Sequence, residues 1–129
     1  MSKLKRKSTM KDSILKTKSY KMALDSVNIC KSLFKNQEYI LSKQFVRSST
    51  SVGANIREAQ YAQSTKDFIH KLSISLKECD ETLYWLDLLK DSNYLTKYDF
   101  ETLSEQAIEL KRMLISSIIT SKNKLKTNN

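Results

Sequence analysis

The chain has 129 residues, a formal net charge of +9, one glycine and no proline. Strand-rich folds need turn residues at short intervals, so this composition excludes them and favours an all-helical domain with one core. No apolar run reaches the roughly 18 residues that a membrane-spanning helix needs. No hydrophobic segment follows the basic N-terminus, which predicts a protein without a secretory signal and a cytoplasmic location.

The positive charge is concentrated near the two ends of the chain. Residues 1–18 contain seven Lys or Arg and one Asp, and residues 111–129 contain five Lys or Arg and no acid. Residues 19–110 are nearly balanced, with 11 basic and 13 acidic side chains. Basic ends indicate an anionic partner such as DNA or RNA; solubilising tails are the alternative explanation.

Apolar spacing predicts four helices between a basic arm, residues 1–12, and a polar tail, residues 124–129, so that the bundle spans 13–123. The first helix is expected to begin between Ile14 and Ser19 and to run to about Lys35. Its inward face is predicted to consist of Ala23, Val27, Cys30 and Phe34, widened by Tyr20, Leu24 and Leu33.

The second and third helices follow after short polar connections. The second is predicted over residues 39–62, with an inward face of Leu41, Phe45, Ser48, Val52, Ile56 and Ala59. The third is predicted over 65–92, with a capping box at Ser64 and Asp67 and a left-handed Asn93 at its end. Its heptad-like seam comprises Ile69, Leu72, Leu76, Cys79, Leu83 and Leu86.

The fourth helix is predicted over residues 97–123, after a second capping box at Thr96 and Asp99. Its inward face comprises Phe100, Leu103, Ala107, Leu110 and Leu114. A second stripe of Ile108, Ile115 and Ile119, with Trp85 and Leu88, is either surplus apolar surface for a partner or a wide core-facing stripe. Short loops make consecutive helices antiparallel, so the predicted fold is an all-α, up-down-up-down four-helix bundle.

The sequence offers little for catalysis. Cys30 and Cys79 fall at apolar helical positions, where small buried core residues are expected rather than a disulfide or a metal pair. His70 is the only histidine, and the chain has neither a nucleophile motif nor a glycine-rich phosphate loop. We therefore expect no enzyme activity, no metal and no cofactor.

The middle of the second helix is unusually small and polar, and it contains the only glycine, Gly53. Ser51, Asn55 and Glu58 lie about one turn apart and are predicted to form a structural polar network that fixes helix register, with a direct ligand site as the alternative. Nearby Lys43 and Arg47 share a face, where they would contact phosphates or pair with acids of a neighbouring helix or subunit. The candidate nucleic-acid contacts are Lys3, Lys5, Arg6, Lys7, Lys43, Arg47, Arg57, Lys122, Lys124 and Lys126.

Several segments in this region resemble one known family. They are Gln44-Phe-Val-Arg47, Ser51-Val-Gly-Ala-Asn55-Ile-Arg-Glu58-Ala59, Asp67-Phe-Ile69, Leu72-Ser-Ile-Ser-Leu-Lys-Glu78 and Glu81-Thr-Leu-Tyr-Trp85-Leu86. Over roughly residues 14–120 the chain resembles the four-helix-bundle proteins encoded by intervening sequences in bacterial 23S rRNA genes. Ala59 stands where many relatives have glycine.

That family includes relatives of the accessory variability protein of diversity-generating retroelements. The resemblance implies a homopentamer of four-helix bundles, binding to nucleic acid and, in the retroelement case, to a reverse transcriptase. The chain is thus expected to be a non-enzymatic, oligomeric nucleic-acid-binding or adaptor protein. The more specific expectation is an accessory protein of a reverse transcriptase. The alternative is a structural protein–protein interaction bundle without nucleic-acid binding.

Overall fold

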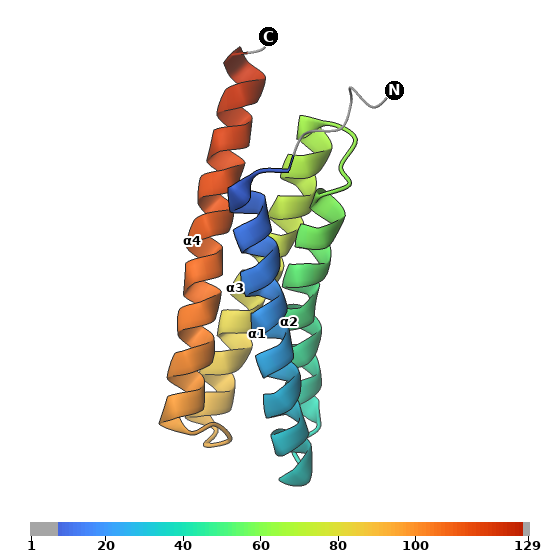
Figure 1. The fold of residues 1–129 in the computed structure, drawn as a ribbon. Helices are drawn as coiled ribbons and strands as arrows, with labels where there is room; N and C mark the ends of the chain where they lie inside the picture. Colours follow the sequence, from blue (N-terminus) through green and yellow to red (C-terminus); the bar gives the residue numbers. More distant parts are fainter. Residues whose placement is uncertain (1–7, 128–129) are drawn as a thin grey trace.

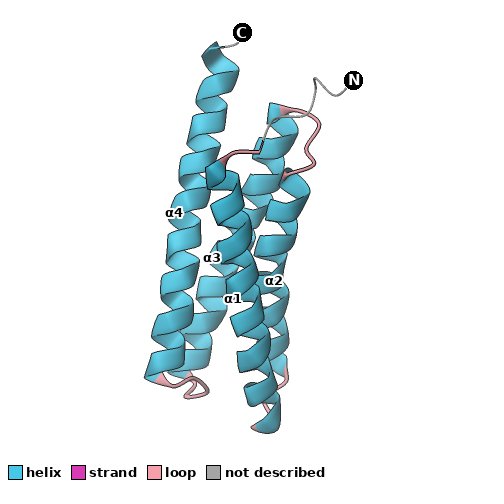
Figure 2. Cartoon of the chain, viewed as in Figure 1, coloured by secondary structure: helices cyan, strands magenta, loops and turns pink. Residues whose placement is uncertain are grey.

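A computed structural model describes residues 8–127, which form four helices: α1 (Met10–Lys35), α2 (Ile40–Ala59), α3 (Thr65–Asp91) and α4 (Lys97–Thr127) (Figure 1). Each helix contacts the next one along the chain, and α1 also contacts α4. Everything else in the described range is loop or turn (Figure 2). The predicted all-α, up-down-up-down bundle is therefore confirmed. None of the described helices has a stretch both long and apolar enough to cross a membrane.

Three helix ends differ from the prediction, and one of them is the end of α2, which lies at Ala59 rather than at residue 62. α1 begins at Met10, earlier than expected, because Thr9 and Asp12 form a reciprocal capping box with hydrogen bonds of 3.0 and 3.1 Å. α4 continues to Thr127 through residues predicted to be tail. The left-handed Asn93 is confirmed, with a φ of 67°. Residues 1–7 of the predicted arm lie outside the described residues.

The inward face of α1 is rotated from the predicted one. Its buried residues are Asp12, Leu15, Ser19, Met22, Ser26, Cys30 and Leu33. Of the predicted face, only Cys30 and Leu33 are buried, whereas Tyr20 and Leu24 are exposed. The prediction failed because it followed apolar residues, while Ser19 and Ser26 occupy core positions. Both hydroxyls bond to carbonyls of their own helix, which makes their burial tolerable.

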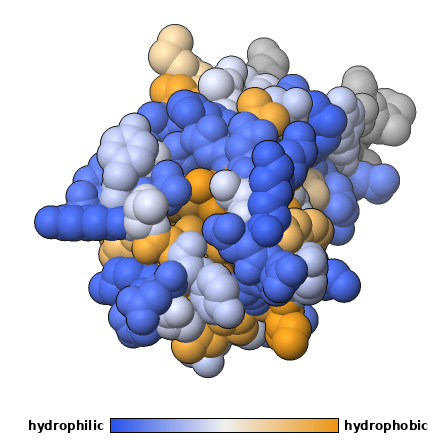
Figure 3. Space-filling view, turned by 90° about the horizontal axis from the view of Figure 1, so that it is seen from below, coloured by the Kyte–Doolittle hydropathy of each residue, from blue (hydrophilic) through white to orange (hydrophobic). Residues whose placement is uncertain are grey.

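The core consists of two apolar clusters along the bundle axis. The larger one includes Val52, Ile56, Leu72 and Leu110, and the smaller one comprises Leu33, Phe45, Leu86, Leu89 and Leu103. The smaller cluster lies at the end that holds the α1–α2 and α3–α4 loops. Seen from that end, the surface is largely hydrophilic with smaller apolar patches (Figure 3). The predicted inward faces of α2 and α4 are mostly buried, whereas Leu41 and Phe100 are only partly so.

α3 shows a second rotation, smaller than that of α1. Its buried line comprises Phe68, Leu72, Ser75, Cys79, Thr82, Leu86 and Leu89. Ile69, Leu76 and Leu83 of the predicted seam are only partly buried and flank this line. Ile108, Ile115 and Ile119 of α4 are exposed, at 38%, 38% and 54%, so they are not a wide core-facing stripe. Trp85 is half-buried against the smaller cluster.

Both cysteines are buried and free, as predicted. The Cys79 thiol donates a hydrogen bond to the carbonyl of Ala107 at 3.1 Å, and burial raises its pKa to about 12. Burial also raises the pKa of Cys30. Since the thiolate is the reactive form, both side chains should be inert in the folded protein.

We therefore expect neither thiol to react quickly with an aromatic disulfide reagent at mildly alkaline pH. In denaturant both should react at the rate of free cysteine, which a spectroscopic thiol titration measures. A thiol that titrates rapidly in the native state would contradict this burial.

Candidate nucleic-acid interface

A surface groove of ≈ 670 Å³ runs between α1 and α2. Its lining residues are Ser13, Lys16, Thr17, Ser19, Tyr20, Ala23, Thr50, Gly53, Ala54 and Arg57. They include four aliphatic hydroxyls, one phenol, two cationic side chains and no acid. Hydroxyls and cations are the groups that bind phosphate oxygens, so this lining suits an anionic backbone.

Small residues on both helices open this groove. Gly53, Ala54 and Ala23 fill little of the space between α1 and α2. A Cβ at Gly53 would lie 3.4 Å from Ser19 Oγ and 3.5 Å from the Ser19 carbonyl oxygen, which are ordinary contact distances. The φ angle of Gly53 is not positive, so its backbone does not require glycine. The absence of a side chain at Gly53 therefore leaves the groove deeper than a larger residue would.

Arg57, one of the predicted contacts, lies on this groove together with Lys16, which the sequence analysis missed. Both side chains are exposed, and neither has an ion-pair partner among the described residues. Lys43, farther along α2, is also exposed and without such a partner. Lys16 was missed because only packing shows which residue of α1 faces Arg57.

Arg47 points to α3. Its guanidinium pairs with Glu78 at 3.3 Å and also contacts Glu81, whose carboxylate in turn accepts from Trp85 Nε1 at 3.0 Å. This is the alternative that the sequence left open for Arg47, namely pairing with acids of a neighbouring helix. The structure therefore separates Arg47 from Arg57, which faces the opposite neighbour.

Of the predicted network of Ser51, Asn55 and Glu58, the structure joins Asn55 to Ser51 but does not join Glu58 to either. Ser51 Oγ donates to the Arg47 carbonyl at 2.7 Å, and Asn55 Nδ2 donates to the Ser51 carbonyl at 2.8 Å. Glu58 instead pairs with Lys71 of α3 at 3.0 Å, and its hydrogen bond raises the pKa of Lys71. The described contacts of Ser51 and Asn55 are thus local to α2.

Buried links between α2 and α3 come from hydroxyls that the sequence analysis did not select. Ser75 Oγ donates to the Val52 carbonyl at 2.8 Å, and Thr82 Oγ1 lies 3.0 Å from Ser48 Oγ. All four residues are fully buried. The seven-residue spacing of Ser75 and Thr82 was the available signal, but apolar Leu76 and Leu83 beside them dominated the pattern.

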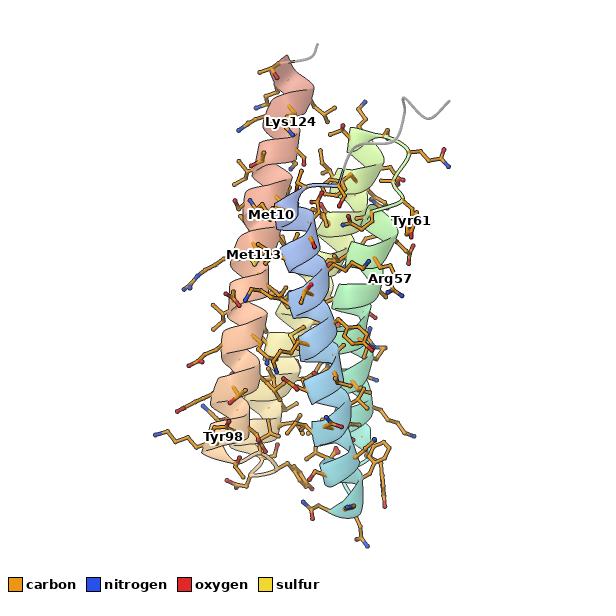
Figure 4. All side chains as sticks on the ribbon, in the orientation of Figure 1. Met10, Arg57, Tyr61, Tyr98, Met113 and Lys124 are labelled. Carbon is orange, nitrogen blue, oxygen red and sulfur yellow. The ribbon has the colours of Figure 1, made fainter. Side chains whose placement is uncertain are left out.

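The predicted C-terminal contacts occupy the last turns of α4. Lys122, Lys124 and Lys126 are exposed there, and every charged residue of α4 after Glu109 is basic. Arg57 and Lys124 lie in the half of the bundle where α1 begins (Figure 4). Lys3, Lys5, Arg6 and Lys7 are outside the described residues. Over residues 8–127, no cluster of three or more His, Cys, Asp or Glu could hold a metal ion.

Comparison with known proteins gives a matching family and similar solved structures. The family model described as 23S rRNA-intervening sequence protein matches residues 11–116. A crystal structure from Bacteroides thetaiotaomicron, of a protein with unknown function from the S23 ribosomal protein family, is 48% identical with a TM-score of 0.83. The match covers 84% of this chain and 98% of that one. The search of curated proteins gave no match.

The geometry at Gly53 predicts that Gly53→Ala is tolerated and stabilising. The added methyl group makes ordinary contacts, and alanine is favoured over glycine in a helix interior by about 1 kcal/mol. Urea unfolding should therefore show a gain of up to about 1 kcal/mol in the free energy of unfolding.

The neighbouring exposed residue provides the matched control. Ala54→Gly should lower the free energy of unfolding by about 1 kcal/mol for the same reason. A loss of stability in Gly53→Ala would show that the α1–α2 contact is tighter than described.

Proposed function

We propose a function from one premise: the chain belongs to the 23S rRNA-intervening sequence protein family. The protein is a non-enzymatic, oligomeric nucleic-acid-binding protein that takes DNA or RNA by its backbone. Its resemblance to the accessory variability protein supports a homopentamer and a reverse transcriptase as protein partner. Two free cysteines suit the cytoplasm, where thiols stay reduced.

One observation carries the nucleic-acid proposal, the composition of the α1–α2 groove. Lys16 and Arg57 border a floor of hydroxyls and small residues, and none of the lining residues is acidic. A sugar–phosphate backbone needs cations and hydrogen-bond donors in a shallow, open surface, and it needs no base-reading side chains. This lining therefore fits binding that is largely independent of sequence.

The charge distribution supports the same proposal. Five acids of the described chain pair with a cation of a neighbouring helix: Glu78 and Glu81 with Arg47, Glu58 with Lys71, Asp80 with Lys111 and Glu109 with Lys18. Lys43 and Lys124 add to the positive field outside the groove. Lys3, Lys5, Arg6 and Lys7 add to the net positive charge of the chain. Such a field raises the rate of encounter with a polyanion.

A second function, a protein–protein interaction bundle without nucleic-acid binding, is favoured by a different observation. Ile108, Ile115 and Ile119 form an exposed apolar line on α4. Apolar lines of this kind mark contacts with other proteins. In that case the basic residues serve solubility, and nucleic acid does not bind.

Binding of fluorescently labelled single- and double-stranded DNA and RNA distinguishes the two functions. We expect fluorescence anisotropy to show binding that weakens steeply between about 50 and 200 mM salt. In Lys16→Gln/Arg57→Gln, the slope of log affinity against log salt should fall by about two, since two phosphate contacts are lost.

Lys31→Gln/Lys35→Gln is the matched control, because it removes the same charge from exposed positions at the other end of α1. This variant should keep the slope of the parent. If the parent binds none of the four nucleic acids at low salt, the interaction-bundle function replaces the proposal. If both variants lose affinity equally, binding is not located in the groove.

A further inference from the structure

The outer face of α4 carries a heptad seam that its own bundle does not use. The seam alternates steps of four and three residues over about 38 Å of helix. Its members are Glu101, Glu105, Ile108, Arg112, Ile115, Ile119, Lys122 and Lys126. All eight side chains are exposed, whereas the opposite face of α4 buries Leu103, Ala107, Leu110 and Leu114.

The seam is bounded on both sides by contacts that orient α4 in its bundle. On one side Lys111 pairs with Asp80 of α3 at 2.7 Å. On the other side Glu109 pairs with Lys18 of α1 at 3.1 Å. Neither α1 nor α3 therefore covers the line between these pairs, and the three isoleucines remain open to water at 38–54% exposure.

Charge changes sign along the seam in an orderly way. It begins with two acids, Glu101 and Glu105, and ends with two bases, Lys122 and Lys126. The isoleucines and Arg112 lie between them. A helix face with opposite charges at its two ends is complementary to itself when a copy runs in the reverse direction.

We propose that this face binds α4 of a second copy of the chain, antiparallel and related by a two-fold axis. The register follows from the spacing: Glu101 meets the partner's Lys126, and Glu105 meets the partner's Lys122. Ile108 then packs on the partner's Ile119. Nearest the axis, Ile115 lies beside the partner's Arg112, whose aliphatic stem covers it while the guanidinium reaches water.

The same charges reject the parallel arrangement. In a parallel pair Glu101 and Glu105 would face their own copies, and so would Lys122 and Lys126, which places like charges together at both ends. The 3.8 Å contact between Lys97 and Glu101 is an exposed pair within one helix, so it offers little competition for Glu101.

This pairing goes beyond the proposed function and does not depend on it. A two-fold contact uses the same surface on both copies and closes on itself, whereas a pentamer needs two different surfaces on each subunit. The α1–α2 groove lies away from the seam and stays accessible in the pair. Nucleic-acid binding and α4 pairing therefore fail or succeed separately.

Cross-linking of the full chain tests the register. In Glu101→Cys/Lys126→Cys, a short bismaleimide reagent should join two chains rapidly, and peptide mapping should find position 101 linked to 126. Glu101→Cys alone and Lys126→Cys alone should cross-link slowly, since equal positions lie far apart in an antiparallel pair. Single variants that react as fast as the double variant, or a double variant that stays unlinked, would overturn the proposal.

Charge-reversal variants test whether the opposite charges at the two ends of the seam stabilise the pair. Glu101→Lys/Glu105→Lys and Lys122→Glu/Lys126→Glu should each weaken α4 pairing by on the order of tenfold, measured by sedimentation velocity. An equimolar mixture of the two variants should pair again, because each then meets opposite charge. Asp87→Lys/Asp91→Lys on α3 is the matched control and should pair like the parent. A mixture that pairs no better than its components would contradict the register.

Discussion

The close approach of α2 to both of its neighbours is the constraint on which the bundle depends. Toward α3, buried Ser48 and Val52 take part in hydrogen bonds with Thr82 and Ser75 at 3.0 and 2.8 Å. Toward α1, Gly53 lies against the backbone of Ser19. A buried hydroxyl without a hydrogen-bond partner destabilises the folded protein. A shift of α2 along α3 would break these hydrogen bonds as well as apolar contacts, and it is therefore disfavoured by both losses. These links therefore fix the register of the two helices.

The same small residues that allow this approach also shape the outer surface. Where α1 and α2 meet solvent, Gly53, Ala54 and Ala23 leave the groove that Lys16 and Arg57 border. The two arginines of α2 therefore differ in their surroundings. Arg47 pairs with acids of α3, whereas Arg57 has no ion pair among the described residues. Core packing thus decides which cations an external anion can reach.

The sequence predicted the fold well and the candidate site only in part. Apolar spacing located all four helices and the inward faces of α2 and α4, since those faces are built mainly from apolar residues. It failed on α1 and α3, where Ser19, Ser26, Ser75 and Thr82 occupy core positions that a hydropathy pattern assigns to the surface. Arg57 was selected from sequence, but the groove was not, because it arises only when two helices are packed together.

A double-mutant cycle between Ser48 and Thr82 tests the central claim most directly. Ser48→Ala, Thr82→Val and the double variant would be compared by urea unfolding. If the buried hydroxyl pair sets the register, the two changes should be coupled by about 1 kcal/mol, because either one alone already breaks the hydrogen bond. Strict additivity of the two losses would contradict the claim that this bond joins α2 to α3.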